Sequence, residues 1–583
     1  MKLNKILMAT AVVFAATAFT GCIKEVFPKE SAITEAQLAQ SSAGMESMMK
    51  SVPASMAAHV AASYDHSDFG YHSVGLNKDH HAMIMFPCAR VDRGGNPYYS
   101  RLQAPNYGFD MGTSGGYTHY IWYNFYPYIK KANDIIGSCG NYESLAQYRG
   151  LAKTFRALFY LELVGYYDCL PAEAPNIGSY AADLNKPGIM GYTVPIVTED
   201  TTEEKAKENP RAKREDMFKF IFEDLADAEE CLADFETYTP SYPELAAVYG
   251  LYARAYMWLG QFEDDIYTSI VAKDDNGNEL KDEDGNLVYA YPNVFTGVAA
   301  YEKALEYAEK AITTANVPFM TREQYSNVTT AFNSVVPSWI WATQMSSDTV
   351  INNLYAFAAH VCPEASYGYG PLACVGVGQN MYDKLGNTDI RKKLIAGPDK
   401  TYEQFQKYTS MSRDEWEELQ YRAPYASFKF RPGQGERVDY MVANAVSLPI
   451  MRIEEMEFIA IEAMLHTGKA VAARDRLVNF VLGNRADVYI FNDTDEAKLL
   501  DEIIFQKSVE FWGEGVILFD LKRLNKGVDT TGQNYQSGML FKQATRLPWW
   551  NLPVPQGETA VNLATKDQVA PNPSYGLESE DAM

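Results

Sequence analysis

Apolar side chains recur at helical spacing in several long stretches of the chain. These stretches are predicted to be amphipathic helices, and they cover residues 120–136, 145–164, 217–232, 245–260 and 301–312. Pro127 predicts a kink or a new helix start inside the first stretch, because proline lacks the amide hydrogen that a helix interior uses. Gly165, which lies ahead of Pro171, is predicted to end the second stretch. The pattern indicates a mainly α fold.

Two of these helices form a pair that is typical of a tetratricopeptide repeat. Small residues such as Ala253 and Ala304 stand where paired helices approach closely, and Gly260 is placed to end the first helix. A similar pattern returns near the C-terminus, where Gly468 is followed by a second predicted helix at 470–481. The chain is therefore predicted to be a scaffold of tetratricopeptide-like helix pairs.

An insertion at 263–300 separates the paired helices. It contains the turn sequences Asp274-Asp-Asn-Gly-Asn278 and Asp282-Glu-Asp-Gly-Asn286, flanked by short strand-like runs. These features predict small β-hairpins. Neither turn has the spacing of an EF-hand calcium loop, so solvated turns are the favoured interpretation, with calcium binding at 274–286 left open.

Aromatic residues and glycines dominate the segment between the two sets of helices, which predicts an irregular, loop-rich lobe. The resulting division of the chain is a signal peptide at 1–21, a lipidated tether at 22–45, an N-terminal helical-repeat region at 46–320, the irregular lobe at 321–446 and a C-terminal region with the returning helix pair at 447–583.

The beginning of the chain has a different pattern. Lys2 and Lys5 precede an apolar stretch at 6–19 that is too short to span a bilayer and is typical of a cleavable export signal. The segment Phe19-Thr-Gly-Cys22 resembles a bacterial lipobox, in which the cysteine receives lipid and becomes the mature N-terminus. An ordinary secretory signal with an incidental cysteine is the alternative. No second apolar span of membrane length follows, so a soluble body outside the cytoplasm is expected.

Composition narrows the possible partners. The 583 residues carry a net charge of −24, which argues against a nucleic-acid partner because such a partner requires a basic surface. The cysteines after Cys22 form no CxxC pair, so the sequence gives no support for a zinc or redox site. Cys362 and Cys374 could pair in an oxidising compartment, and their disulfide state is left open.

No catalytic constellation is evident in the sequence. Gly112-Thr-Ser-Gly-Gly116 matches the nucleophile elbow formally, but a loop-like sequence precedes it where the elbow needs a strand. His80-His81 lacks a spaced third ligand, and no HExxH, P-loop or GxGxxG motif occurs. The expectation is a protein that is not an enzyme and that has no cofactor and no metal.

Several segments, in order along the mature chain, resemble the SusD/RagB family of outer-membrane lipoproteins from Bacteroidetes. They are 122–133, the helix at 152–160, Asp383 with Asp389-Ile-Arg391, Arg452 and Glu455 with Glu462-Ala463 and Gly468, Glu510 and Glu514 with Asp520 and Arg523, and the tail from Leu552 through Gln556, Glu558 and Asn562 to Asn572-Pro573. Ile517, Gly557 and Ala560 depart from the family pattern. The charged residues of these motifs are interpreted as scaffold that ties helices together.

The resemblance implies a lipid-anchored protein of the outer membrane, facing the cell exterior, that binds a glycan over a SusC-like TonB-dependent transporter. Peptide binding by the same fold is the alternative, and a structural subunit of a surface complex is another. A lipoprotein hydrolase is the enzyme alternative, and the lack of a nucleophile–base set argues against it. The sequence names neither the glycan nor the transporter.

Sugar recognition uses flat aromatic faces with polar neighbours, so exposed aromatic residues in loops are the predicted ligand contacts. Two clusters qualify, Tyr98, Tyr99, Tyr107 and Phe109 in the first and Tyr367 and Tyr369 in the second. Glycines flank the second cluster and are expected to leave its rings exposed. Trp549-Trp550 is a third possibility, for which core packing is favoured, and Trp339 and Trp341 are assigned to the core.

Overall fold

A computed structural model provides the structure of the chain. It describes residues 42–57, 60–62, 66–87, 112, 113, 115–173, 188–345, 357–368, 375–533, 540 and 542–566. The chain divides into two compact units, Met1–Glu46 and Ser47–Met583. Among the described elements, only the first residues of helix α3 (Ser42–Ala57) fall in the first unit.

Three long helices begin the second unit's helical scaffold: α6 (Gly116–Cys139), α7 (Ala146–Tyr167) and α9 (Arg214–Cys231). Arg156 of α7 joins all three. Its guanidinium donates two hydrogen bonds of 2.7 Å to Asp224 of α9 and one of 2.7 Å to Asn133 of α6. Because these groups are buried, each must be paired, which fixes how the helices meet.

One predicted boundary is wrong, because α7 runs through Gly165 to Tyr167. Pro127 does not start a new helix, since α6 continues on both sides of it, and the predicted kink there stays a prediction. A Cβ atom at Gly165 would lie 2.4 Å from ring carbons of Phe519. The glycine therefore permits close packing of a helix on an aromatic ring and does not end the helix.

The predicted helix pair is confirmed as α10 (Leu245–Leu259) and α11 (Gly297–Ala315). The small residues Ala253 and Ala304 are fully buried, and Gly260 follows the last residue of α10. A Cβ atom at Gly260 would lie 2.6 Å from the ring of Tyr301, so only glycine allows the two helices to approach this closely. Helix α11 packs against α10 on one side and α19 on the other.

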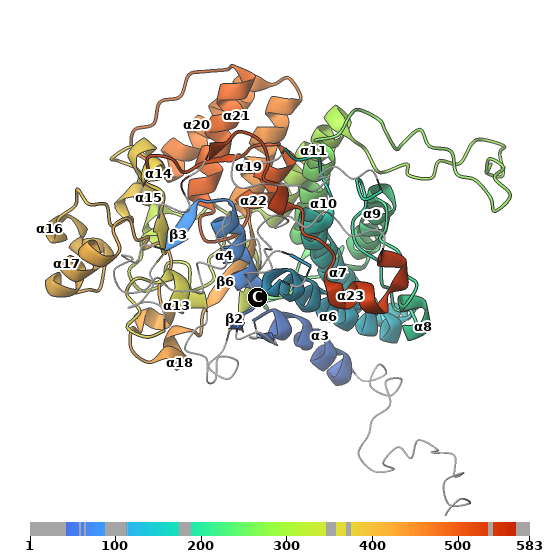
Figure 1. Ribbon diagram of the computed structural model, residues 1–583, viewed down its shortest axis with the longest axis horizontal. Coiled ribbons are helices and arrows are strands. Elements are labelled where there is room, and N and C mark those ends of the chain that lie inside the picture. The colour runs from blue at the N-terminus through green and yellow to red at the C-terminus, as the bar shows by residue number, and fades with distance from the viewer. Residues whose placement is uncertain are drawn as a thin grey trace, which may run out of the picture. The chain divides into compact units, whose positions relative to one another are not determined.

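Between α10 and α11 the insertion forms an exposed arm, residues 270–290, which projects away from the helices as the green loop in Figure 1. Three backbone amides close a triangle of hydrogen bonds: Ala272 donates to Val288 (2.8 Å), Val288 to Leu280 (3.0 Å) and Leu280 to Ala272 (2.8 Å). The predicted β-hairpins are present only as isolated bridges stabilised in this way.

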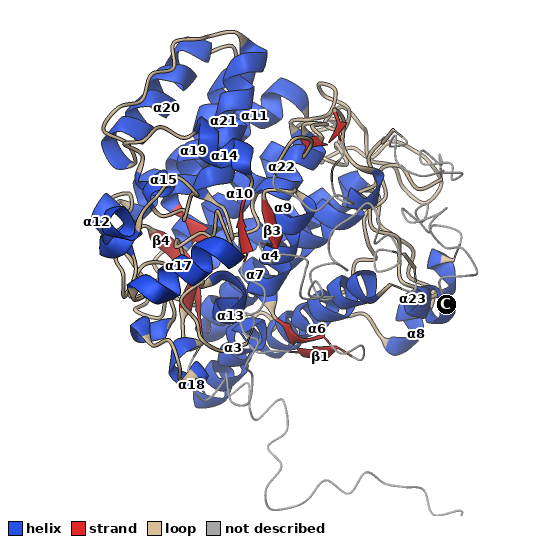
Figure 2. Cartoon of the chain, turned by 60° about the vertical axis from the view of Figure 1, so that its left-hand side comes forward, coloured by secondary structure: helices blue, strands red, loops and turns tan. Residues whose placement is uncertain are grey.

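The second helix pair is confirmed as α19 (Ile453–His466) and α20 (Ala470–Asn484), with Gly468 in the left-handed conformation between them (φ +76°). The apolar side chains of this pair form one cluster with those of α21 (Glu496–Glu510), in which Phe458, Leu477 and Ile503 are fully or almost fully buried. The short helix α22 (Ile517–Arg523) follows. Figure 2 shows α19, α20 and α21 side by side with α11.

The segment predicted to be an irregular lobe carries short helices. They are α12 (Arg322–Tyr325), α13 (Phe357–Val361), α14 (Gln379–Lys384), α15 (Ile390–Lys393), α16 (Tyr402–Phe405), α17 (Arg413–Arg422) and α18 (Tyr440–Ala443). Its strand β4 (Trp339–Gln344) pairs antiparallel with β6 (Ser447–Arg452), which leads into α19. The lobe is thus joined to the C-terminal helix pair by backbone hydrogen bonds.

The other described elements are short, apart from α4. They are β1 (Val60–Ala62) paired with β2 (His66–Phe69), α4 (Tyr71–His81), β3 (Met85–Pro87) paired with β5 (Val375–Val377), α8 (Glu203–Ala206), β7 (Val528–Asp529) paired with β8 (Lys542–Gln543), α23 (Gln556–Val561) and the 3-10 turns η3 (Glu143–Leu145), η4 (Gln406–Tyr408), η5 (Gly433–Gly435), η7 (Pro548–Trp550) and η8 (Leu563–Thr565).

Candidate functional site

The two aromatic clusters predicted to contact ligand belong to two segments, and one end of each segment joins the described part of the chain at the same place. Tyr98, Tyr99, Tyr107, Phe109 and Tyr369 lie outside the described residues. The first segment leaves the described chain after Pro87 of β3, and the second re-enters it at Val375 of β5. These two residues are directly paired in the antiparallel sheet. One end of the β3–β5 pair therefore anchors both segments.

Tyr367 is the one predicted ligand contact that the structure describes, and its ring is not exposed as expected. Only 8% of the residue is accessible, and its hydroxyl donates a hydrogen bond of 2.9 Å to the Oδ1 atom of Asn444. Neighbouring Ser366 is bonded to the carbonyl of Arg437 through both its amide and its hydroxyl. The predicted exposure is therefore wrong for Tyr367, and direct ligand contact by this residue stays a prediction.

The four tryptophans that the sequence assigned to the core are buried, as predicted. Trp339 and Trp341 lie in β4, and Trp549 and Trp550 form the 3-10 turn η7. The indole nitrogen of Trp341 donates to the carbonyl of Ser241, and that of Trp550 donates to the carbonyl of His81, both at 3.2 Å. They therefore belong to the scaffold.

A further set of aromatic residues stacks between α9, α10 and α11. Phe222, Tyr252, Tyr256 and Tyr307 form near-parallel pairs, the closest being Tyr252–Tyr307 with ring centroids 4.2 Å apart and an interplanar angle of 13°. Because these ring faces cover one another, the stack serves helix packing and leaves little face for a ligand.

Tyr123 is an exposed aromatic residue that the sequence analysis did not single out. It lies on the outer face of α6, with 49% of the residue accessible, and its ring stacks on His119 one turn earlier (centroids 5.8 Å apart, interplanar angle 21°). The signal that could have revealed it is the helical spacing, since Trp122 and Phe125 occupy the buried face of the same helix.

A pocket of about 110 Å³ lies where α4, α7, α10, α19 and α22 meet. Its lining carries equal numbers of opposite charges, arranged in pairs such as Lys78–Glu162 (2.7 Å) and Arg254–Glu455 (2.6 Å). Pockets for small ligands are usually roughly 300–1,000 Å³, whereas this space holds about three or four waters at roughly 30 Å³ each. It is too small for an oligosaccharide.

Helix α4 is polar in sequence and yet buried from Ser73 to His81. Asp79 accepts hydrogen bonds from the backbone amides of Gly513 (2.5 Å) and Gly515 (3.4 Å), which joins α4 to the turn after α21. Burial raises the pKa of Asp79 to about 7, against the opposing effect of these two amides. Burial also lowers the pKa of His72 and His80 to about 3, so both imidazoles are neutral at pH 7.

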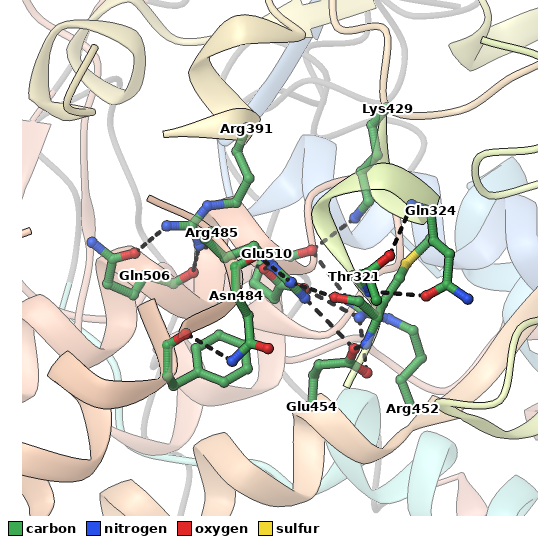
Figure 3. A network of polar contacts seen from close by, with 12 residues as sticks. Thr321, Gln324, Arg391, Lys429, Arg452, Glu454, Asn484, Arg485, Gln506 and Glu510 are labelled. Atoms are coloured by element: carbon green, nitrogen blue, oxygen red, sulfur yellow. Dashed lines mark hydrogen bonds and ion pairs between the residues drawn. The ribbon is translucent and has the colours of Figure 1, made fainter. Parts of the chain in front are cut away.

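The motif residues interpreted as scaffold form a buried ion-pair network (Figure 3). Its centre is Glu510, whose carboxylate accepts hydrogen bonds from Arg485 (2.7 and 2.8 Å) and Arg452 (3.2 Å) and lies 3.5 Å from Arg391. Burial alone would raise the pKa of Glu510, but the surrounding arginines, Arg485 first, hold it well below its usual range. The network binds α15, β6, α20 and α21 together.

Three further motif residues, Glu462, Asp520 and Arg523, form a second buried cluster with Lys507. Arg523 donates to Glu462 (2.6 Å) and to Asp520 (2.6 Å), and Lys507 pairs with Asp520 at 2.7 Å. Ile517, where the sequence departs from the family pattern, is buried at the start of α22. These contacts confirm the interpretation of the charged motifs as scaffold.

The turns of the arm use their carboxylates internally. Asp274 accepts hydrogen bonds from the amides of Asn276 (2.9 Å) and Asn278 (2.8 Å) and from the side chain of Asn278 (3.0 Å), and Asp282 repeats this arrangement with Asp284 and Asn286. These bonds lower the pKa of both aspartates. Within the described part of the chain no three His, Cys, Asp or Glu residues are grouped as metal ligands would be.

Two other predictions fall partly outside the described residues. A helix does begin at Gly116 after Gly112-Thr-Ser-Gly, but Ser114 and residues 101–111 before the motif are not described. Cys22 and Cys374 lie outside as well, whereas Cys362 is buried. Within the described ranges, no helix combines the length and the apolar character needed to cross a bilayer.

No family model matches the sequence, and no curated protein matches it either. Solved structures do. A SusD-like carbohydrate binding protein from Bacteroides vulgatus is 17% identical, with a TM-score of 0.63, over 90% of this chain and 96% of the other. A SusD superfamily protein from Bacteroides thetaiotaomicron is 16% identical (TM-score 0.61, 89% and 98%). A SusD-like carbohydrate binding protein from Bacteroides fragilis is 14% identical (TM-score 0.58, 90% and 99%). The chain therefore has the SusD-like fold that its motifs predicted.

Proposed function

We propose that the chain is a cell-surface lipoprotein that captures oligo- or polysaccharide and delivers it to a partner TonB-dependent transporter in the outer membrane. It catalyses no reaction in this proposal. The observation that carries the proposal is the fold, which spans 90% of the chain and is shared with proteins described as carbohydrate binding.

The anchoring of both aromatic segments at the β3–β5 pair supports a single ligand site. Pro87 and Val375 are paired residues, so the segment that carries Tyr98 leaves the described chain where the segment that carries Tyr369 re-enters it. In this proposal, rings from the two segments contact one ligand together. Flat aromatic faces cover the apolar C–H patches of sugars, and neighbouring polar groups bind the hydroxyls.

A lipid anchor at Cys22 would explain how a modest affinity for the glycan is enough for its delivery to the transporter. Stable anchoring needs two or more acyl chains, at about 0.8 kcal/mol per buried CH₂. Holding the binding protein and the transporter in one membrane raises the effective concentration of captured glycan at the channel, without any new contact.

The glycan proposal is tested with protein lacking residues 1–22, by affinity electrophoresis and calorimetry against a panel of polysaccharides and a peptide mixture. We expect binding to at least one polysaccharide. The combined variant Tyr98→Ala, Tyr99→Ala and Tyr369→Ala is expected to bind at least about tenfold more weakly, since each 1.4 kcal/mol lost is about tenfold in affinity. Tyr238→Ala, which removes an exposed ring elsewhere, is the matched control and should bind as the unchanged protein does.

Two outcomes contradict this proposal, and a third contradicts the placement of its ligand site. Binding to peptides alone would indicate a peptide-capture protein, and the net charge of −24 would then favour cationic peptides. No binding to any glycan or peptide would indicate a structural subunit of a surface complex. Undiminished binding by the triple variant would place the ligand elsewhere on the chain.

The anchor is tested by Cys22→Ser. We expect the unchanged protein in the membrane fraction and accessible to added protease on intact cells, because acyl chains on Cys22 hold it there. The variant should leave the membrane fraction almost completely. A variant that stays membrane-bound to the same extent would show that the anchor lies elsewhere, and Cys139→Ser, which alters a buried cysteine, controls for the substitution itself.

A further inference from the structure

The outer face of α6 presents a fixed aromatic surface. Tyr123 is largely exposed, and His119 supports one side of its ring by parallel stacking. The imidazole of His119 is itself held by a contact of 2.9 Å between its Nδ1 atom and the carbonyl of Gly115. Both rings stand on a long helix, so little conformational freedom is lost when a ligand covers them.

The C-terminal segment determines where the Tyr123 ring lies. A Cβ atom on Gly557 would lie 2.4 Å from the Tyr123 hydroxyl, so in this structure the hydroxyl lies against the Gly557 backbone. Helix α23 is tied to the start of α6, where the amide of Gln556 donates to the carbonyl of Thr113 at 2.8 Å. Figures 1 and 2 show α23 beside α6. Gly557 is a departure from the family's tail motif, and here it makes room for this ring.

A carboxylate borders the same surface. Glu558 follows Gly557 and accepts a hydrogen bond of 3.0 Å from the side chain of Asn562, which in turn is bonded to the carbonyl of Asn209 at 2.6 Å. Burial, followed by the charge of Glu558, raises the pKa of the Tyr123 hydroxyl. A carboxylate accepts hydrogen bonds from sugar hydroxyls and repels sugars that carry carboxylate or sulfate groups.

We infer that Tyr123 and His119 form a stacking platform for a pyranose ring of a neutral glycan, with Glu558 accepting its hydroxyl groups. The exposed ring face covers the apolar C–H side of the sugar, and the acidic border excludes uronic and sulfated glycans. The inference rests on the proposed function and adds to it a class of glycan and a residue that contacts it.

The test compares Tyr123→Ala, Tyr123→Phe and Tyr142→Ala by calorimetry against neutral and anionic polysaccharides. We expect the unchanged protein to prefer neutral glycan, with affinity that is insensitive to salt because no charge pairing is involved. Tyr123→Ala should bind about tenfold more weakly, as expected when roughly 1.4 kcal/mol is lost. Tyr123→Phe, which keeps the ring, and Tyr142→Ala, which removes another exposed tyrosine, should stay close to the unchanged protein.

The outcomes separate this inference from the proposed function. Neutral glycan binding that is unaffected in Tyr123→Ala overturns the platform and leaves glycan capture standing. A preference for anionic glycan overturns the assignment of ligand class alone. No glycan binding by the unchanged protein overturns both. Thermal unfolding of each variant shows whether a loss of binding reflects a loss of fold. If Tyr123→Ala does not fold, Glu558→Gln serves as the test. It keeps the shape of the side chain, removes its charge and should allow anionic glycan to bind.

Discussion

Replacement of Glu510 by alanine is expected to lower the free energy of unfolding by about 3–5 kcal/mol or to prevent folding. Breaking a buried ion pair by removing one partner has roughly this cost, because an uncompensated charge remains in the interior. Here Arg391, Arg452 and Arg485 would all lose their shared carboxylate, and each is almost fully buried. Denaturant unfolding monitored by tryptophan fluorescence measures the change.

The control for this substitution is Asp134→Ala. Asp134 pairs with Lys130 at 2.8 Å on the exposed face of α6, and surface pairs of this kind contribute about 0–1 kcal/mol. Glu510→Gln separates charge from shape, since it keeps the size of the side chain and removes the charge. A Glu510→Ala variant as stable as Asp134→Ala would show that the network adds nothing to stability.

Gly515→Ala is expected to destabilise the protein by about 3 kcal/mol or more. Gly515 has φ +71°, and a left-handed conformation costs an L-residue roughly 1–2 kcal/mol. A Cβ atom there would also lie 2.3 Å from the Cα atom of Gly75, and overpacking costs typically about 1–3 kcal/mol more. The contact is between two backbones, so no side chain can rotate away to relieve it.

Gly468→Ala is the matched control for this second substitution. Gly468 has a similar φ of +76°, but no atom lies within 4 Å of a Cβ atom built there. The variant should lower the free energy of unfolding only by the cost of the left-handed conformation, about 1 kcal/mol. Equal effects of the two substitutions in denaturant unfolding would show that the backbones of α4 and of the turn after α21 can move apart without a loss of stability.

The helix pairs could be predicted from the sequence because small residues at helical spacing are typical of helices that pack closely together. Ala253 and Ala304 are buried where α10 and α11 touch, and Gly468 ends α19 as Gly260 ends α10. The predicted end of α7 at Gly165 was wrong because tertiary packing overrides local preference. Phe519, remote in sequence, is what requires a glycine at position 165.

Helix α4 could not be predicted, since its sequence Tyr-His-Ser-Val-Gly-Leu-Asn-Lys-Asp-His-His lacks an apolar face. Its burial depends on partners far along the chain, such as Glu162 for Lys78 and the amides of Gly513 and Gly515 for Asp79. Such pairings are invisible to periodicity because they arise only once the fold has formed.

The candidate site was predictable only in part. Residue type and flanking glycines pointed to the aromatic segments, but glycines do not fix the direction of a ring, and Tyr367 points inward to Asn444. Nothing in the local sequence shows that the two segments attach at paired residues of β3 and β5. Tyr123 was missed because an aromatic residue in a long helix usually belongs to the core.

The arm between α10 and α11 is a suitable place to insert a label into this protein. Its two ends meet at Ile270 and Ala290, which share a backbone hydrogen bond of 2.8 Å, and its triangle of hydrogen bonds closes within the arm itself. Insertions are tolerated where the affected backbone is exposed and makes few bonds to the rest of the fold. An epitope, a fluorophore or a shortened linker could therefore replace the arm's tips, which would allow the protein to be labelled while its helices stay paired.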